Sequence, residues 1–425
     1  MQKHDYARLG ETLYTDTLPN GLRLCVIPKP GFRSSFAAFA TDYGGVHRRF
    51  RLDGQTVDTP AGVAHFLEHK MFDLPNGDNA LNLLAANGAD PNAFTSGDMT
   101  CYYFQCTHSF EEDLRMLLHF VSTPYFTAES VQKERGIITQ EIRMGEDSPG
   151  TAIYYMLLRQ LYARHPIRER VIGTVESIAE ITHETLYACH RAFYAPSNMC
   201  LCVEGDVDPE RIRAIAQECL GEECRALPET DFGEEEALLP LQSSGQEVMA
   251  VSAPQFLIGA KLRPAGTGEA ALRQRLEAQL ALRVLLGSSS PFYTRLYADG
   301  VLNRDYDYEA DFSAGTGTVI LGGESPQPER VLEELRSEVA GVCAEGFDAA
   351  RFERARRASY GARLRALEDF DNVCIALASG VFDGYCALDA PLLLQEVSRS
   401  ACEAFVRENL ADERLSIAII EPKKV

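Results

Sequence analysis

The sequence predicts an α+β protein built from two homologous domains in tandem, each a mostly antiparallel sheet packed on helices. Three observations lead to this fold class. The chain has 425 residues, whereas one domain usually takes roughly 150. A set of strands and helices in the first half returns in the same order in the second half. An acidic stretch without amphipathic periodicity, 221–246, separates the two sets.

The first half alternates short apolar runs with amphipathic segments. A strand is expected at 22–27, after the turn Pro19-Asn20-Gly21, and another at 34–42, before Gly44-Gly45. We expect one continuous strand over 93–106 and a further strand over 199–204. The periodicity predicts helices at 60–73, 78–87, 110–122, 128–146, 152–163 and 183–194.

The second half repeats this order. The strand predicted at 256–262 lies 220 positions after 36–42, and a helix start at 347–349 lies 221 positions after 126–128. The final helix and strand, 399–408 and 415–420, answer 183–192 and 200–205 at a spacing of roughly 215, which is too long for a solenoid repeat. The sequence therefore predicts a first domain at 1–220, a linker at 221–246 and a second domain at 247–425.

Composition excludes several classes of protein. The chain is 45% hydrophobic and 24% charged, as soluble globular proteins are. Its net charge of −21 argues against binding nucleic acid or an anionic membrane surface, both of which attract cationic proteins. No segment reaches the ~18 apolar residues of a membrane helix, and the N-terminus lacks the apolar region of a signal peptide. A cytoplasmic protein is expected.

The twelve cysteines are scattered and mostly lie inside apolar runs, where they are expected to be reduced and to pack as small hydrophobic residues. Cys219 and Cys224 could form half of a metal site, but no second pair or nearby histidine completes it.

The motif His65-Phe66-Leu67-Glu68-His69 carries the chemistry. On a helix, His65 and His69 are about 40° apart on one face, so both imidazoles can meet one metal ion. Glu68 lies next to His69 and one turn from His65, so its carboxylate can lie beside the same ion. A hydrolytic zinc site needs a third protein ligand, an open position and a base beside the water.

The helix at 128–146 offers the third ligand. Glu134 and Glu141 are seven residues apart and therefore nearly in line on that helix. Either carboxylate alone would usually be a solvated surface charge, and a single helical histidine is more often structural than a ligand. The second half acts as a control, because His190 is the last histidine of the chain. Positions matching His65, Glu68 and Glu141 there hold Leu285, Ser288 and Ala362.

These residues stand in a longer pattern that resembles the insulinase/pitrilysin family of zinc peptidases. The matching segments are 62–72 (GVAHFLEHKMF), 92–95 (NAFT) and 134–142 (ERGIITQEI), and H-x-x-E-H is the inverted zinc motif of inverzincins. Segments 172–178, 195–198 and 296–300 are similar to its short, two-domain YmfH-like bacterial branch. The resemblance implies a half-clamshell with one Zn²⁺ per chain, held by His65, His69 and Glu141. It also implies that Glu68 is the general base and Glu134 a supporting catalytic carboxylate. The edge strand Asn92, Ala93 and Phe94 would then pair with the substrate backbone.

The sequence lacks one feature of the family, and this absence suggests that a second subunit is needed. Active members carry an Arg and a Tyr seven residues apart in a non-catalytic domain, but Leu296 and Asn303 occupy the expected positions here. Arg295 or Tyr306 could substitute only after an insertion shift. We therefore expect a related second subunit to supply this pair in a heterodimer; a homodimer is the alternative. The expected substrate is a peptide or an unfolded segment.

Two other functions remain open at this point. The chain could be a non-catalytic scaffold subunit that retains a zinc site, as the missing Arg/Tyr pair suggests. It could also hydrolyse non-peptide amides, which need the same zinc chemistry. The acidic composition is compatible with basic peptides as substrates, but a solvated acidic surface is the preferred explanation, because no acidic cluster outside the linker is tied to the site.

Overall fold

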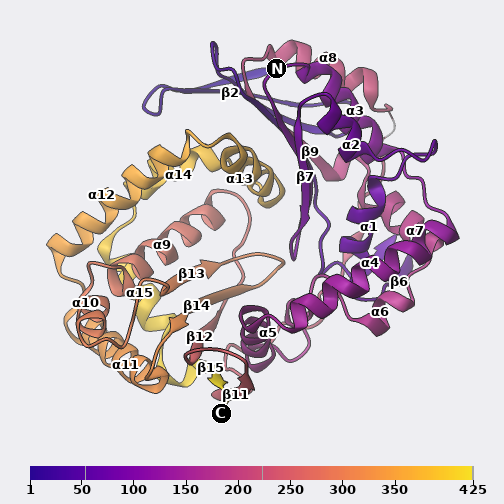
Figure 1. Ribbon diagram of the computed structural model, residues 1–425. Coiled ribbons are helices and arrows are strands. Elements are labelled where there is room, and N and C mark those ends of the chain that lie inside the picture. Colours follow the sequence, from indigo (N-terminus) through magenta and orange to yellow (C-terminus); the bar gives the residue numbers. More distant parts are fainter. Residues whose placement is uncertain (53, 223, 424–425) are drawn as a thin grey trace. The chain divides into compact units, whose positions relative to one another are not determined.

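A seven-stranded sheet organises the first of the two units into which the chain divides (Figure 1). The computed structural model describes residues 1–52, 54–222 and 224–423. Neighbouring strands are antiparallel except for β3 and β9, which are parallel. The strand order is β1 (Gln2–Tyr6), β2 (Glu11–Thr17), β3 (Arg23–Pro28), β9 (Met199–Gly205), β4 (Ser35–Thr41), β8 (Thr100–Cys106) and β7 (Asp90–Thr95).

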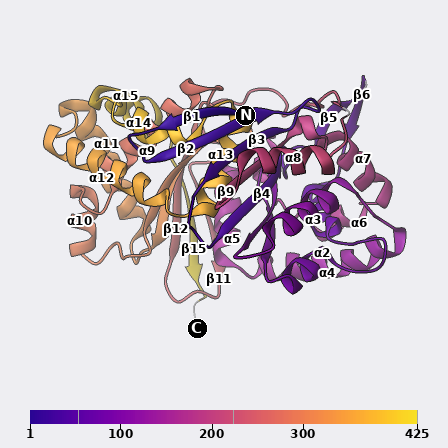
Figure 2. The ribbon, with the colours of Figure 1, turned by 90° about the horizontal axis from the view of Figure 1, so that it is seen from above.

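Helices cover both faces of this sheet. One face packs into a large core with α1, α3, α4, α7 and α8, while α13 (Phe370–Asp383) packs on β4 and β9 from the other side (Figure 2). The helices of the first core and its rim are α1 (Val63–Met71), α2 (Ala80–Ala86), α3 (Phe110–Ser122), α4 (Ala128–Glu146), α6 (Val175–Ala179), α7 (His183–Phe193) and α8 (Pro209–Cys219). The 3₁₀ turns Pro166–Arg168, Pro196–Asn198, Ala387–Asp389 and Asp412–Arg414 connect longer elements along the chain.

The second unit has a five-stranded sheet in which only β11 and β15 are parallel. Its order is β11 (Ser244–Met249), β15 (Ser416–Pro422), β12 (Gln255–Leu262), β14 (Gly317–Glu324) and β13 (Asp307–Asp311). The helix α5 (Pro149–Leu161) packs on β12 and β15 through Leu157, Ala418 and Ile420. The remaining helices are α9 (Glu269–Leu286), α10 (Pro291–Ala298), α11 (Pro328–Glu345), α12 (Ala349–Ala366), α14 (Ala390–Leu394) and α15 (Arg399–Asn409).

The two halves of the sequence exchange a helix. The long helices α4 and α12 begin at 128 and 349, and the helices after them, α5 and α13, begin at 149 and 370. Both spacings are 221 positions, so α5 and α13 are equivalent elements of the repeat. The α5 helix packs in the second unit and α13 in the first, so the units are discontinuous: 1–142, 169–232 and 364–388, against 143–168, 233–363 and 389–425. The boundaries 1–220, 221–246 and 247–425 remain a prediction about the sequence repeat.

The structure confirms the α+β fold class and most of the predicted elements. The helices at 110–122 and 128–146 have the predicted limits. The single strand predicted over 93–106 is wrong, because the chain turns at 96–99 and forms the hairpin β7–β8. Within the acidic segment, β10 (Glu229–Thr230) pairs with β5 (Arg49–Leu52), whose other partner is β6 (Gln55–Asp58), and Ser244 begins β11.

All twelve cysteines are free, as expected of reduced thiols. Among the described residues, no single helix combines the length and the hydropathy needed to cross a membrane; the bent pair Phe370–Asp383 and Ala387–Leu394 meets both criteria only when taken together.

Candidate metal centre

The helix α1 places two imidazoles side by side. Its N-cap is Gly62, whose φ of 96° lies in the left-handed region that favours glycine. A Cβ there would lie 2.6 Å from the carbonyl oxygen of Ile172, so the approach also excludes a side chain. From this start, His65 and His69 fall one turn apart, and their ring centroids are 4.7 Å apart. The predicted spacing of the two histidines is therefore realised.

The helix α4 brings two carboxylates to these rings. Nε2 of His65 lies 3.6 Å from Oε1 of Glu141, and Nε2 of His69 lies 3.7 Å from Oε2 of the same carboxylate. On the far side of His69, Nδ1 lies 3.0 Å from Oε1 of Glu134. His65, His69 and Glu141 thus point ligand atoms at one position, and Glu134 fixes the orientation of one ring from behind.

The donor set fits zinc. Two nitrogen atoms and a carboxylate form the His₂Glu set that catalytic zinc sites use, with a fourth position left for water or substrate. Ligand atoms on a tetrahedral zinc ion are about 3.4 Å apart, given metal–ligand distances near 2.1 Å, and the two contacts to Glu141 are close to that value. The His69–Glu134 pair corresponds to the carboxylate–histidine contact that usually supports a zinc-bound imidazole.

Burial sets the protonation of these groups. It lowers the pKa of His65 to about 3, and the neighbouring His69 adds to the effect, so His65 is neutral and able to bind a metal. Burial also opposes the charged form of His69, but the hydrogen bond with Glu134 and the nearby carboxylates outweigh it and raise the pKa of His69. For Glu134, the same hydrogen bond outweighs burial and lowers the pKa of the carboxyl group.

Glu68 lies beside this group without belonging to it. Its side chain is buried, and Oε2 accepts a short hydrogen bond from the hydroxyl of Thr95, the last residue of β7. Burial raises the pKa of Glu68, which suits a carboxylate that must take up and return a proton. Thr95 was not among the residues predicted for the site. A signal was present in Ser96-Gly97-Asp98, a turn sequence that would have ended a strand at Thr95.

The predicted substrate-binding residues lie on an edge strand. Within the described sheet, β7 is the last strand and pairs only with β8. Asn92 and Ala93 line a cavity of about 640 Å³ that also touches Glu68, His69 and Glu134. Phe94 does not line it; its ring lies 6.3 Å from that of Tyr103 and packs towards the core under α13. The role of these three residues in substrate binding remains a prediction.

Arg295 and Tyr306 both belong to the second unit. The Arg295 guanidinium contacts Glu334 at 2.7 Å and Glu338 at 3.6 Å on α11. Tyr306 is buried, and its hydroxyl has no hydrogen-bond partner in the described part of the chain. Whether either residue completes a site remains a prediction. Among the described residues, Cys219 and Cys224 belong to no group of three metal-ligating side chains.

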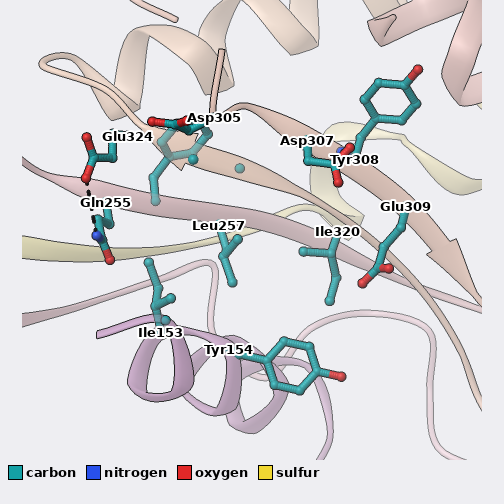
Figure 3. A pocket seen from close by; sticks show the side chains of 14 residues that line it. Ile153, Tyr154, Gln255, Leu257, Asp305, Asp307, Tyr308, Glu309, Ile320 and Glu324 are labelled. Atoms are coloured by element: carbon teal, nitrogen blue, oxygen red, sulfur yellow. Dashed lines mark hydrogen bonds between the residues drawn. The ribbon is translucent and has the colours of Figure 1, made fainter. Parts of the chain in front are cut away.

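A second cavity, of about 550 Å³, lies inside the second unit between α5 and the strands β12, β13 and β14 (Figure 3). Its polar lining is acidic, with no histidine or cysteine among the residues that form it. The carboxylates and rings that line it are Asp305, Asp307, Glu309, Glu324, Tyr154 and Tyr308. This cavity therefore does not repeat the metal chemistry of the first unit.

The fold and the site together define an α+β protein with an H-x-x-E-H metal group of the inverzincin kind. Residues 54–175 match the family described as Insulinase (Peptidase family M16), and residues 180–359 match the Peptidase M16 inactive domain. The chain belongs to the M16, or insulinase, family of peptidases. Its two α+β domains are the N-terminal domain of that family and its inactive C-terminal counterpart.

Three relatives illustrate the similarity. The uncharacterized zinc protease YmfH of Bacillus subtilis (strain 168) is 35% identical over 424 residues, which cover 99% of each chain. A crystal structure of an M16-like peptidase from Alicyclobacillus acidocaldarius has a TM-score of 0.92 and 33% identity, covering 97% of this chain and 99% of that one. Pitrilysin shares the fold with a TM-score of 0.80 and 15% identity; all of this chain covers 47% of it.

Proposed function

We propose that this protein is a zinc-dependent peptidase that hydrolyses peptides or unfolded segments. The observation that carries the proposal is the convergence of His65, His69 and Glu141 beside the buried carboxylate of Glu68. The family supports it, since homologues such as YmfH are named zinc proteases. We assign one zinc ion per chain to the three convergent ligands.

A bound zinc ion would supply Lewis acidity towards a water molecule and an amide carbonyl. Residues of the chain supply the proton transfer and the positioning of the reacting groups. Glu68 takes a proton from the attacking water and returns it to the leaving amine nitrogen, while Thr95 holds its carboxylate in place. Glu134 keeps the ring of His69 oriented through Nδ1. The edge strand β7 offers unpaired backbone groups to an extended peptide, which favours a peptide over other amides as substrate.

We further propose that the active enzyme contains two chains, this one and a related subunit that supplies the Arg/Tyr pair, with a homodimer as the alternative. Two observations support pairing. This chain in full corresponds to about half of the pitrilysin fold. Within the described structure, Arg295 is engaged by carboxylates of its own unit. A closed chamber formed by two such chains would admit peptides and unfolded segments.

The test combines zinc content with turnover. The purified chain, alone and co-expressed with a related subunit, is assayed on a mixed-length peptide pool by mass spectrometry. We expect about one zinc per chain and cleavage that Glu68→Gln abolishes without loss of zinc. Glu141→Gln should lose both, and Glu129→Gln, an exposed change on the same helix, should lose neither.

Each other outcome contradicts part of the proposal. Full turnover by a homogeneous monomer would exclude pairing. Stoichiometric zinc without cleavage in either sample would favour a scaffold subunit. Cleavage by Glu68→Gln at the wild-type rate would exclude Glu68 as the base.

A further inference from the structure

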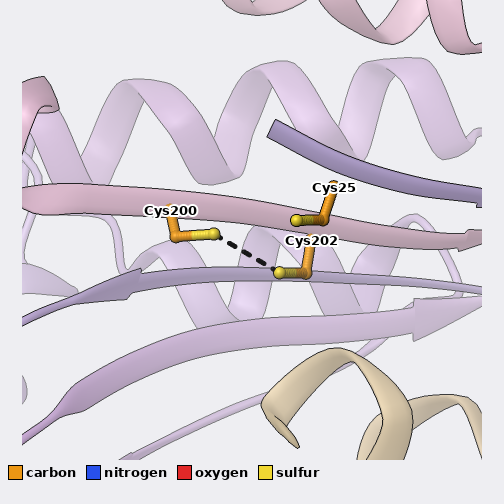
Figure 4. A group of neighbouring side chains, drawn as sticks. All are labelled: Cys25, Cys200 and Cys202. Carbon is orange, nitrogen blue, oxygen red and sulfur yellow. Dashed lines mark hydrogen bonds between the residues drawn. The ribbon is translucent and has the colours of Figure 1, made fainter. Parts of the chain in front are cut away.

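Three cysteines outside the metal centre converge in the first unit. In the parallel pair of β3 and β9, Cys25 lies opposite Cys202, and Cys200 lies two residues earlier on the same face of β9. The three sulfur atoms all lie within 4.8 Å of one another, and those of Cys200 and Cys202 are 3.5 Å apart. Figure 4 shows the three side chains gathered on one side of their strands. Two adjacent strands thus bring three sulfur atoms together.

This sulfur cluster is shielded from water. Cys200 and Cys202 are fully buried and Cys25 is 4% exposed. They belong to the core between the sheet and α13, whose Phe370 and Leu377 pack in the same layer. Any ion held there would have no water ligand, so its coordination would come from the sulfur atoms alone.

A partly buried cation lies next to the sulfur cluster. Arg23, on the same face of β3, is paired in register with Cys200. Its guanidinium donates to the carbonyl oxygen of Val381 at 3.1 Å and lies over the ring of Phe382, 5.0 Å from the centroid. Its Nε is buried without an acceptor among the described residues. The carboxylate of Asp42 also interacts electrostatically with this guanidinium.

Packing alone would be served by small apolar side chains, as at Ala38 opposite Cys202 on β4. Besides packing in this core, the three cysteines bring three potential metal-ligand atoms together.

We propose that Cys25, Cys200 and Cys202 form a structural site for a soft monovalent ion, copper(I), separate from the His65–His69–Glu141 group. Cysteine sulfur selects soft ions such as Cu(I) and zinc. Zinc takes four ligands in structural sites, whereas this buried group offers three, which suits three-coordinate copper(I). The site fastens β3 to β9 beneath α13.

Charge balance fixes the protonation of the complex. As the ion enters, two S–H bonds break, two protons leave to solvent and two thiolate–copper bonds form, while the third sulfur binds as a neutral thiol. Copper stays monovalent, so no oxidant or reductant is required. The complex carries one negative charge and lies beside the guanidinium of Arg23, which is paired in register with Cys200.

The test uses the full chain with the exposed Cys224 and Cys343 changed to Ser. The protein is refolded without oxygen in bicinchoninate-buffered copper(I), so that burial does not block entry, and is then examined by elemental analysis and X-ray absorption. We expect one copper per chain with only sulfur in its first shell. Cys202→Ala should lose it, whereas Cys189→Ala, a buried change on α7, should keep it. Arg23→Met should weaken binding about 10- to 100-fold, as loss of a supporting group does.

Three results would overturn the proposal: no copper retained after refolding, copper retained equally by Cys202→Ala, or a first shell containing nitrogen, which would place the ion at the histidines. If Cys202→Ala does not fold by circular dichroism, Cys202→Ser replaces it. The absorption spectrum of the parent remains decisive in that case, because no other three cysteines converge in the described part of the chain.

Discussion

Nδ1 of His69 lies 3.0 Å from Oε1 of Glu134, so one carboxylate of α4 supports the same ring that another carboxylate, Glu141, approaches from its Nε2 side. A hydrogen bond at Nδ1 fixes both the tautomer and the plane of the ring. The two acidic residues on α4 therefore have different tasks, one towards the metal and one towards its ligand.

Because Glu134 orients the ring of His69, its removal should lower the affinity of the site for zinc. We expect Glu134→Gln to weaken zinc binding about 10- to 100-fold, because the imidazole loses its charged partner. Competition with a chromophoric chelator measures the change. Glu129→Gln, on an exposed position of α4, should bind zinc as the wild type does. Equal affinities of the Glu134 variant and the wild type would assign Glu134 no supporting role.

Removing the hydroxyl of Thr95 should lower kcat without changing the zinc content. Thr95→Val removes the hydrogen bond that orients Glu68, so we expect kcat to fall about tenfold, a modest share of the total effect of a general base. Zinc content should stay at the wild-type level. The matched change Thr56→Val, exposed on β6, should alter neither quantity. A fall in zinc content with Thr95→Val would instead show a structural role.

Glycines 62 and 136 should respond in opposite directions to alanine. At Gly62, the φ of 96° and the 2.6 Å approach to Ile172 leave no room for Cβ, so Gly62→Ala should cost on the order of 2–3 kcal/mol of unfolding free energy. At Gly136, inside α4, a Cβ meets nothing within 4 Å, so Gly136→Ala should gain ~0.5–1 kcal/mol. Urea denaturation measures both, and equal effects would contradict the helix start described here.

A buried carboxylate should make stability depend on pH. Burial raises the pKa of Glu204 from 4.5 to about 7. The ammonium group of Lys29, 3.1 Å away, opposes this shift, but it also forms an ion pair with Glu11. The negative charges of Glu11 and Asp369 raise the pKa of Glu204 further. At a pH between 4.5 and 7, the Glu204 carboxyl group is protonated in the folded state and ionised in the unfolded state. The free energy of unfolding therefore falls as pH rises from about 4.5 to 7.

Replacing that carboxylate should flatten the profile. With Glu204→Gln, we expect the decline between pH 4.5 and 8 to shrink by on the order of 2–3 kcal/mol, read from urea midpoints. Lys29 keeps Glu11 as its partner in the variant. The exposed Glu247→Gln serves as the control and should leave the profile unchanged. A profile that Glu204→Gln does not alter would show that Glu204 is ionised in the folded state throughout.

The core of the site could be predicted from the sequence because its geometry is local. His65 and His69 share a helical face by spacing alone, and Glu134 and Glu141 align on a helix whose limits were predicted correctly. Thr95 could not be found in this way, because it reaches Glu68 only through the hairpin that was predicted as one strand. Ala93-Phe94 before Ser96-Gly97-Asp98 and the apolar residues from Met99 to Cys106 after it outweighed the turn residues between them.

The exchange of α5 and α13 could not be predicted either. Both α5 and α13 have an apolar face that could pack against either sheet. The periodicity of the sequence reveals the apolar face but not which of the two sheets it contacts. The repeat of 221 positions identifies the two helices as equivalents, but only the structure shows where each one packs.

The exchanged helix α13 sets a condition on how this chain matures on the ribosome. The sheet of the first unit is complete in sequence once Gly205 has been made. Among the described residues, however, the apolar side chains on one of its faces, such as Leu13, Ile27 and Phe36, pack against residues of the segment 364–388. That face stays bare while some 160 further residues are translated, which at ~5–20 residues per second takes on the order of ten to thirty seconds. During this interval the nascent chain exposes an apolar sheet face that is open to aggregation.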